Sequence, residues 1–263
     1  GCVNLETNSS LESPTNTKRY KLIVLTGHDE YWTDTLRKNL DNFVKAGNSL
    51  AVFSGNTNFR RLVIEQNSVR RDKHTAELNP TENTIGLACR FGCFPVTNFR
   101  HIKNLEKVNI YFTNKKHLKG MKVIAEQHPI FKNTNLKNND FFGIEERLIW
   151  YEVDGAPLNP ITDKIDRERL PKVSAIHDGK IILDQPYEAY HAIPLAASYL
   201  YGFNNIEPQY AATFVEFKNG DGIVLNGGSV GWYRVLKNDS ISKMIFRNTI
   251  IYLLIESFFS TLY

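Results

Sequence analysis

Two short apolar runs near the N-terminus predict buried β-strands. Residues 21–26 (KLIVLT) and residues 49–54 (SLAVFS) are rich in aliphatic and β-branched side chains, and a glycine follows each run. Continuous apolar runs of this length are typical of strands that are buried on both faces. Residues 33–46, between the two runs, carry apolar side chains at helical spacing. The pattern therefore predicts a strand–helix–strand unit with parallel strands and a right-handed crossover.

The ends of the predicted helix carry capping signals. Thr33 suits the N-cap position, because its hydroxyl oxygen can accept a backbone N–H of the first turn. Gly47 suits the position after the last helical residue, where a left-handed backbone is common. A second, short helix is expected to begin near Thr57, after the break that Gly55 and Asn56 introduce.

The rest of the chain is less regular. Residues 1–19 are polar, and we interpret them as an irregular lead-in. Residues 65–175 contain many asparagines and only short strand-like runs, which favours a large irregular insertion or a lid-like subdomain folded against the sheet. Residues 211–217 and 223–226 flank the turn sequence NGDG and predict a hairpin. Residues 240–259 predict a closing helix.

The expected fold class is therefore α/β. We predict a single domain over residues 1–263, with a mostly parallel sheet flanked by helices. The first residue is Gly and not Met, which we interpret as a cut edge, so that an N-terminal portion is missing from this chain.

Composition excludes several classes of protein. Hydrophobic residues make up 42% and charged residues 23% of the chain, as in a folded, water-soluble protein. The net charge is only +4, which does not favour nucleic acid or a membrane as a partner. No apolar run approaches the roughly 20 residues that a membrane span needs. We expect a soluble protein, with the cytoplasm as the favoured location.

The loop of residues 27–32 (GHDEYW) concentrates titratable side chains at the end of the first predicted strand. Ligands of open parallel sheets bind at this edge, beside the N–H groups of a helix N-terminus. His28 and Glu30 are expected to project to the same side of an extended loop, which suits a metal ligand beside a proton-transfer group. Alternatively, Asp29 and Glu30 complement the helix dipole while His28 satisfies a backbone carbonyl.

The second predicted strand ends in the corresponding sequence SGNT. Asn56 in this turn is placed to hydrogen-bond a ligand or, alternatively, to cap a helix. Because consecutive strands of such a unit often pair, we expect the two loops to share a pocket. The candidate catalytic residues are therefore His28, Glu30 and Asn56. The candidate pocket residues are Asp29, Tyr31, Trp32, His128 and Trp232.

His128 and Trp232 also have structural interpretations. A loop histidine can be satisfied by the backbone, and a tryptophan after a strand can pack in the core. The turn after the second predicted strand, where the nucleophile of a G-x-S-x-G or G-x-C-x-G elbow would sit, holds Gly55 and Asn56 instead, and the chain has no H-E-x-x-H or phosphate-binding glycine motif. A serine or cysteine nucleophile is thus not indicated.

Three separated motifs resemble one known family. The sequence GHDEYW, followed by FSGNT, resembles the G-H-[DP]-E-Y-W-type loop and F-x-G-N-T turn of the C-terminal domain of the N,N-dimethylformamidase large (beta) subunit family. The segment from His128-Pro129 through Gly143 to YEVDG falls on family-like positions. The segment GDGIVLNGGSVGWYRVL is similar to the motif G-x-V-x-x-x-G-[ST]-x-x-W, which lies near the end of the family's domain. The resemblance spans nearly the whole chain in order.

The resemblance implies a fold, a function and a cofactor. The fold would be that of the class I glutamine amidotransferases, which is flavodoxin-like, without their cysteine. The function would be an amidase-like hydrolase of C–N bonds with a small-molecule substrate. In the amidase, tyrosines and the glutamate of the H-x-E-Y loop hold an iron, so that Glu30 would be the metal ligand here and His28 a proton-transfer or supporting group.

The family's tyrosine ligands lie upstream of this loop, where this chain offers only Tyr20, at the wrong end of the first strand. Tyr31 or a partner chain would then have to supply ligands, as in a homo-oligomer. Two other functions stay open. One is a non-catalytic binding or scaffolding domain with an amidotransferase-like fold. The other is a sugar-related protein like those of the trehalose-utilisation family, which share the strand–helix–strand opening.

Overall fold

The computed structural model describes about two thirds of the chain. The described residues are 11–55, 57, 60–65, 68–71, 94–95, 119–150, 152–156, 158–159, 161–166, 174–177, 180–183, 192–201 and 208–259. In the first half, the elements in chain order are α2 (Pro14–Thr17), β1 (Leu22–His28), β2 (Tyr31–Thr33), α3 (Asp34–Lys45), β3 (Ser49–Gly55), β4 (Arg60–Glu65), β5 (Ser68–Arg71), β6 (Phe94–Pro95) and β7 (Met121–Val123).

The second half adds the strands that complete the central sheet and two helices. These elements are η4 (Pro129–Phe131), β8 (Phe141–Phe142), β9 (Asp154–Ala156), β10 (Ser174–His177), β11 (Lys180–Leu183), β12 (Ile193–Tyr201), β13 (Pro208–Asn219), β14 (Gly222–Asn226), α7 (Trp232–Asn238) and α8 (Ser240–Phe259). None of the described helices combines the length and the apolar composition that crossing a membrane requires.

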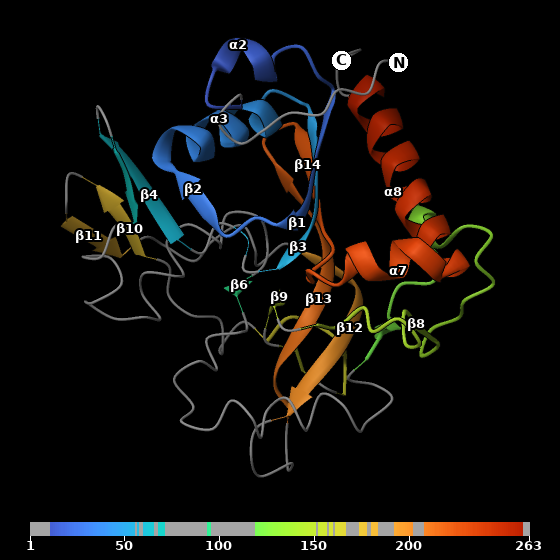
Figure 1. Ribbon diagram of the computed structural model, residues 1–263. Helices are drawn as coiled ribbons and strands as arrows, with labels where there is room; N and C mark the ends of the chain where they lie inside the picture. The colour runs from blue at the N-terminus through green and yellow to red at the C-terminus, as the bar shows by residue number, and fades with distance from the viewer. Residues whose placement is uncertain are drawn as a thin grey trace.

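A mixed sheet forms the centre of the described structure (Figure 1). Its strand order is β1-β3-β14-β13-β12-β7-β8, with β9 beside β13 and β6 beside β9. Strand β3 pairs in parallel with β1 and with β14. The other strand pairs of this sheet are antiparallel, namely β14–β13, β13–β12, β12–β7, β7–β8, β13–β9 and β9–β6.

The α/β class is confirmed, but the prediction of a mostly parallel sheet is wrong for the described strands. The helix α3 carries the chain back to the starting end of the sheet, and therefore β1 and β3 are parallel. Strands β13 and β14 are instead joined by a two-residue turn at residues 220–221, which forces an antiparallel pair. The predicted hairpin of residues 211–217 and 223–226 is thereby confirmed.

The N-terminal unit has the expected strands and helix, followed or interrupted by short strands that were not expected, β2, β4 and β5. The hydroxyl of Thr33 accepts the backbone N–H of Leu36 at 3.1 Å, as predicted for the N-cap of α3. Gly47, after the helix, has a φ of 86°, in the left-handed region that glycine adopts without strain. The short helix expected near Thr57 is wrong for the described residues, because β4 begins at Arg60. The β-branched residues of β4 favour an extended chain, and β4 pairs with both β2 and β5.

Helices cover both faces of the sheet at β3 and β14. Helix α3 lies on one face, and α7 and α8 lie on the other (Figure 1). The side chains of β3 alternate accordingly, since Val52 packs with Leu40 of α3 while Phe53 packs with Trp232 of α7. This two-sided burial explains why all seven residues of β3 are buried.

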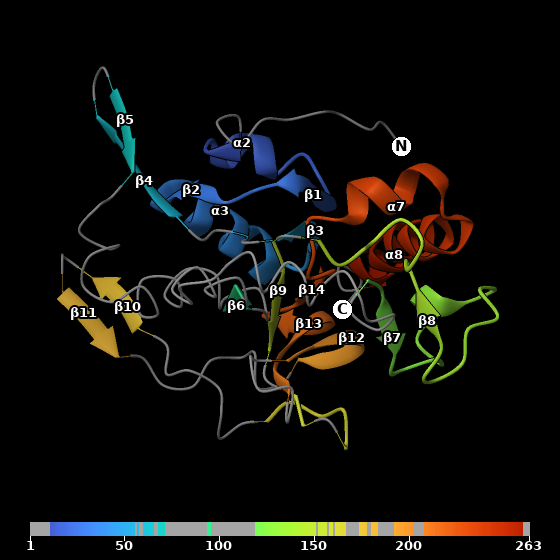
Figure 2. The same cartoon turned by 60° about the horizontal axis from the view of Figure 1, so that its bottom comes forward.

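About half of the predicted insertion over residues 65–175 lies outside the described residues, and the insertion stays a prediction. Within it, β7, β8 and β9 extend the central sheet. Strands β10 and β11 form a separate antiparallel pair. This pair and the β4–β5 hairpin lie to one side of the central sheet in both views (Figures 1 and 2).

A buried polar contact links α8 to the sheet, and we call it the α8 clasp. His128 Nε2 lies 3.0 Å from Glu216 Oε2 of β13. His128 Nδ1 accepts the backbone N–H of Ile130 at 3.4 Å, so that the neutral ring carries its hydrogen on Nε2 and donates it to Glu216. The ring of Tyr252, in α8, meets the His128 ring edge-on, with the two ring centroids 5.0 Å apart.

The α8 clasp predicts a loss of stability at high pH. Burial, with the carboxylates of Glu216 and Glu256, raises the pKa of Tyr252 well above its usual range. Above a pH of about 10, the unfolded chain loses a proton that the folded state keeps, so the free energy of unfolding falls as the pH rises. We expect Tyr252→Phe to show a smaller fall between about pH 9 and about pH 11, measured by urea unfolding. Tyr233→Phe, at an exposed tyrosine of α7, is the control and should fall as the wild type does.

Candidate functional site

The carboxyl ends of β1, β3 and β14 meet at one edge of the sheet. In the parallel register, His28 at the end of β1 stands opposite Gly55 at the end of β3. Asn226 at the end of β14 stands opposite Val52. The loops that follow β1 and β3 therefore start side by side, as expected, and the turn that begins at Gly227 starts at the same edge of the sheet.

A distant segment, residues 152–154, is fixed across this edge by backbone hydrogen bonds. The N–H of Asp154 donates to the Gly228 carbonyl at 3.0 Å, and the N–H of Val230 donates to the Glu152 carbonyl at 3.0 Å. Gly228 has a φ of 63°, and a Cβ there would lie 2.1 Å from the Thr213 carbonyl oxygen. The glycine is thus needed both for its backbone conformation and for the close approach of neighbouring strands.

Gly55 allows the same segment to approach the end of β3. A Cβ at Gly55 would lie 2.2 Å from the carbonyl oxygen of Glu152. Such a distance is far below van der Waals contact, so any side chain here would displace residues 152–154 from the sheet edge. The predicted break at Gly55 therefore serves a close backbone contact.

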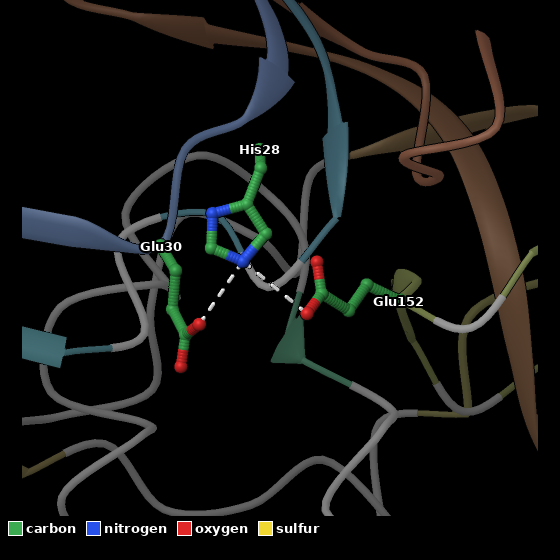
Figure 3. Close-up of side chains that lie close together, drawn as sticks. All are labelled: His28, Glu30 and Glu152. Carbon is green, nitrogen blue, oxygen red and sulfur yellow. Dashed lines mark ion pairs between the residues drawn. The ribbon is translucent and has the colours of Figure 1, made fainter. Parts of the chain in front are cut away.

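These contacts place one imidazole between two carboxylates. His28 Nε2 lies 3.2 Å from Glu30 Oε2 and 3.3 Å from Glu152 Oε1 (Figure 3). The side chain of His28 is 41% exposed, whereas those of Glu30 and Glu152 are 3% and 4% exposed. The cluster is therefore open to solvent on the histidine side and closed on the carboxylate side.

The three side chains of the cluster could hold a metal ion. One ligand atom from each of His28, Glu30 and Glu152 lies within 4.8 Å of the other two. Ligands about 2.1 Å from one metal ion, at tetrahedral or octahedral angles, lie about 3.0–3.4 Å apart. The two distances at His28 Nε2 fall in this range. Among the described residues, no second group of three histidine, cysteine or acidic side chains comes together in this way.

The neighbours of His28 in the loop have different positions. Asp29 is buried and accepts the Trp32 indole N–H with its Oδ1 at 3.0 Å and its carbonyl oxygen at 3.1 Å. Trp32 is fully buried in the core beneath α3. The hydrogen bonds from Trp32 to Asp29 thus fix the conformation of the loop on its buried side. Tyr31 is 41% exposed, and its ring centroid lies 6.0 Å from that of His28, so Tyr31 flanks the open side of the cluster.

The remaining predicted residues are not brought to the cluster by the described contacts. Trp232 is buried in the core, where its indole donates to the Gly227 carbonyl at 3.0 Å and its ring packs against Phe53. His128 belongs to the α8 clasp. Asn56 lies outside the described residues.

Glu152 was not predicted as a site residue, although it lies in the motif YEVDG, which resembles the family. The available signal was the spacing of Glu152 and Asp154 about Val153, because alternate residues of an extended segment share a face. Val153 is fully buried in the core, as this alternation requires. Asp154 Oδ2 accepts the backbone N–H of Thr57 at 3.1 Å, and so reaches the turn after β3.

Comparison with known proteins identifies the family. Residues 3–243 match the family model described as N,N-dimethylformamidase beta subunit-like, C-terminal. The match covers most of the 263 residues and all three segments that meet at the cluster, and the chain therefore belongs to this family. No curated protein matches the chain.

The contact at Gly55 gives a test of how the site is built. In Gly55→Ala, the new methyl group meets a backbone carbonyl that is itself hydrogen-bonded, so we expect a loss of about 3 kcal/mol in the free energy of unfolding. Urea unfolding measures this loss. The neighbouring Ser54→Ala removes only a 3.3 Å hydrogen bond to the Gly55 carbonyl and should cost about 1 kcal/mol. Equal losses in the two variants would contradict the close contact.

Proposed function

We propose that this chain is an amidase-like hydrolase of C–N bonds whose reaction centre is the cluster of His28, Glu30 and Glu152. The observation that carries the proposal is the position of His28 Nε2 between two buried carboxylates. These residues come from two of the family's motif segments, and the third segment fixes Glu152 in place. The substrate is proposed to be a small molecule that carries an amide.

We further propose that the cluster holds a divalent metal ion. The donors are one imidazole nitrogen and two carboxylate oxygens, a set that suits iron, zinc or manganese. Two buried carboxylates beside each other also favour a cation between them. When bound, the ion supplies Lewis acidity toward a carbonyl oxygen.

The resemblance to the family implies that the proposed metal is iron. The candidate ligands in the cluster differ, however, from those that the resemblance implies. Tyr20 precedes β1 and so lies at the opposite end of that strand from His28. In the described part of the chain, a histidine and a second glutamate accompany Glu30. Among the described residues, Tyr31 lies beside His28, on the exposed side of the cluster.

The side chains of the cluster can carry the proton transfers of amide hydrolysis. Water attacks the carbonyl carbon, loses a proton to a base, and the amine nitrogen must gain a proton as the C–N bond breaks. A carboxylate oxygen of Glu30 or Glu152 is proposed to accept that proton and return it to the leaving nitrogen. Because only the His28 side of the cluster is exposed, the substrate is expected to approach past His28 and Tyr31.

Substitution of each glutamate tests the metal centre. We expect Glu30→Gln and Glu152→Gln to lose most of the metal found in the wild type, because each change removes a charged ligand while keeping the shape of the side chain. Elemental mass spectrometry of the purified proteins measures the metal. Glu216→Gln is the matched control, since Glu216 is also buried and also contacts a histidine, but belongs to the α8 clasp. It should retain the wild-type metal content.

Hydrolysis of simple amides tests the activity. The metal-loaded wild type is expected to release amine from small amides such as N-substituted formamides, and Glu152→Gln is expected to be slower by about 100-fold or more. Amine release is followed by chromatography, with Glu216→Gln as the active control. A wild type that contains no metal and releases no amine would instead favour a binding domain.

A further inference from the structure

We propose that Asp154 is a positioning residue that holds the Glu152 carboxylate against His28 by fastening residues 152–154 to the turn after β3. The inference rests on the proposed function only in that it treats His28, Glu30 and Glu152 as the reaction centre. The contact that carries the inference is the one in which Asp154 Oδ2 accepts the Thr57 N–H at 3.1 Å.

Asp154 is placed by its strand position. In the extended segment, Glu152 and Asp154 project to one side, while Val153 between them projects into the core. The first carboxylate contacts the loop after β1, at His28. The second accepts the N–H of Thr57 in the turn after β3. One short segment thus presents a carboxylate to each of two neighbouring loops.

The contact with Thr57 supplies a restraint that the backbone bonds do not. The bonds to Gly228 and Val230 fix residues 152–154 relative to the end of β14. The bond from Thr57 to Asp154 fixes the same residues relative to the end of β3. Asp154 is 1% exposed and Thr57 is 2% exposed, so water does not readily replace this bond when it is lost.

The position of Glu152 must be held closely for the cluster to function. Ligating and catalytic side chains have to be kept within about 0.5 Å of their productive geometry. Groups that hydrogen-bond to metal ligands and orient them typically lower the metal affinity by about 10- to 100-fold when they are removed. A shift of residues 152–154 away from the turn would move Glu152 Oε1 from its 3.3 Å contact with His28.

The experiment compares two substitutions of Asp154 in the full chain. Asp154→Ala removes the acceptor for the Thr57 N–H and is expected to weaken Zn²⁺ binding by about 10- to 100-fold in calorimetric titration of the metal-free protein. Asp154→Asn keeps an acceptor oxygen at the same place and is expected to retain most of the affinity. Faster hydrogen exchange of the Thr57 amide in Asp154→Ala, but not in Asp154→Asn, would show that the intended bond was changed.

A control separates positioning from general destabilisation. Asn39 of α3 is similarly buried, and its side chain donates to the carbonyls of Leu11 and Glu12. Asn39→Ala is expected to lower thermal stability while leaving Zn²⁺ affinity unchanged. If Asp154→Ala lowers stability but binds Zn²⁺ as the wild type does, Asp154 is merely structural and the inference is overturned.

A second measurement keeps the test independent of the proposed metal. The imidazole nitrogen chemical shifts of His28, measured by NMR in metal-free protein, report on the contact with Glu152. They are expected to change in Asp154→Ala and to remain near those of the wild type in Asp154→Asn and Asn39→Ala. A wild type that binds no Zn²⁺ would overturn the metal proposal alone, whereas unchanged His28 shifts in Asp154→Ala would overturn the role of Asp154.

Discussion

The candidate site depends on the close approach of two backbone segments that only glycine permits. Residues 152–154 lie across the ends of β3 and β14, and Gly55 and Gly228 leave no side chain between the segment and the sheet. The approach delivers Glu152 to His28 and Asp154 to Thr57. Side chains that are distant in sequence are thus brought together by a contact in which no side chain takes part.

Among the described residues, two histidines, His28 and His128, contact glutamates at similar distances, and their surroundings separate their roles. In the α8 clasp, both nitrogens of His128 are engaged, one by the Ile130 N–H and one by Glu216. The clasp therefore joins elements of the fold. His28 instead meets two carboxylates with one nitrogen and keeps a large exposed surface. A ring that is held on one side and open on the other is the one suited to meet a substrate.

Local signals in the sequence were sufficient for local structure. The N-cap Thr33, the tight turn between β13 and β14, and the closing helix α8 all depend on neighbouring residues, and all three were predicted. The pairing of β7 with β12 and of β9 with β13 was not predicted, because each pair joins residues far apart in the chain. The residues of the candidate site differ in the same respect. His28 and Glu30 could be predicted because they lie within one loop of six residues, whereas the position of Glu152 depends on its backbone contacts with residues 228–230.

The span of chain that separates the members of the cluster has a consequence for biosynthesis. His28 and Glu30 leave the ribosome long before Glu152, and the turn at residues 228–230 that fixes Glu152 follows later still. Contacts over such sequence separations form slowly, because a long loop has to be closed first. During synthesis, β1, α3 and β3 can therefore pair early while the cluster remains unassembled. The three side chains of the cluster therefore come together only after the C-terminal hairpin has joined the sheet.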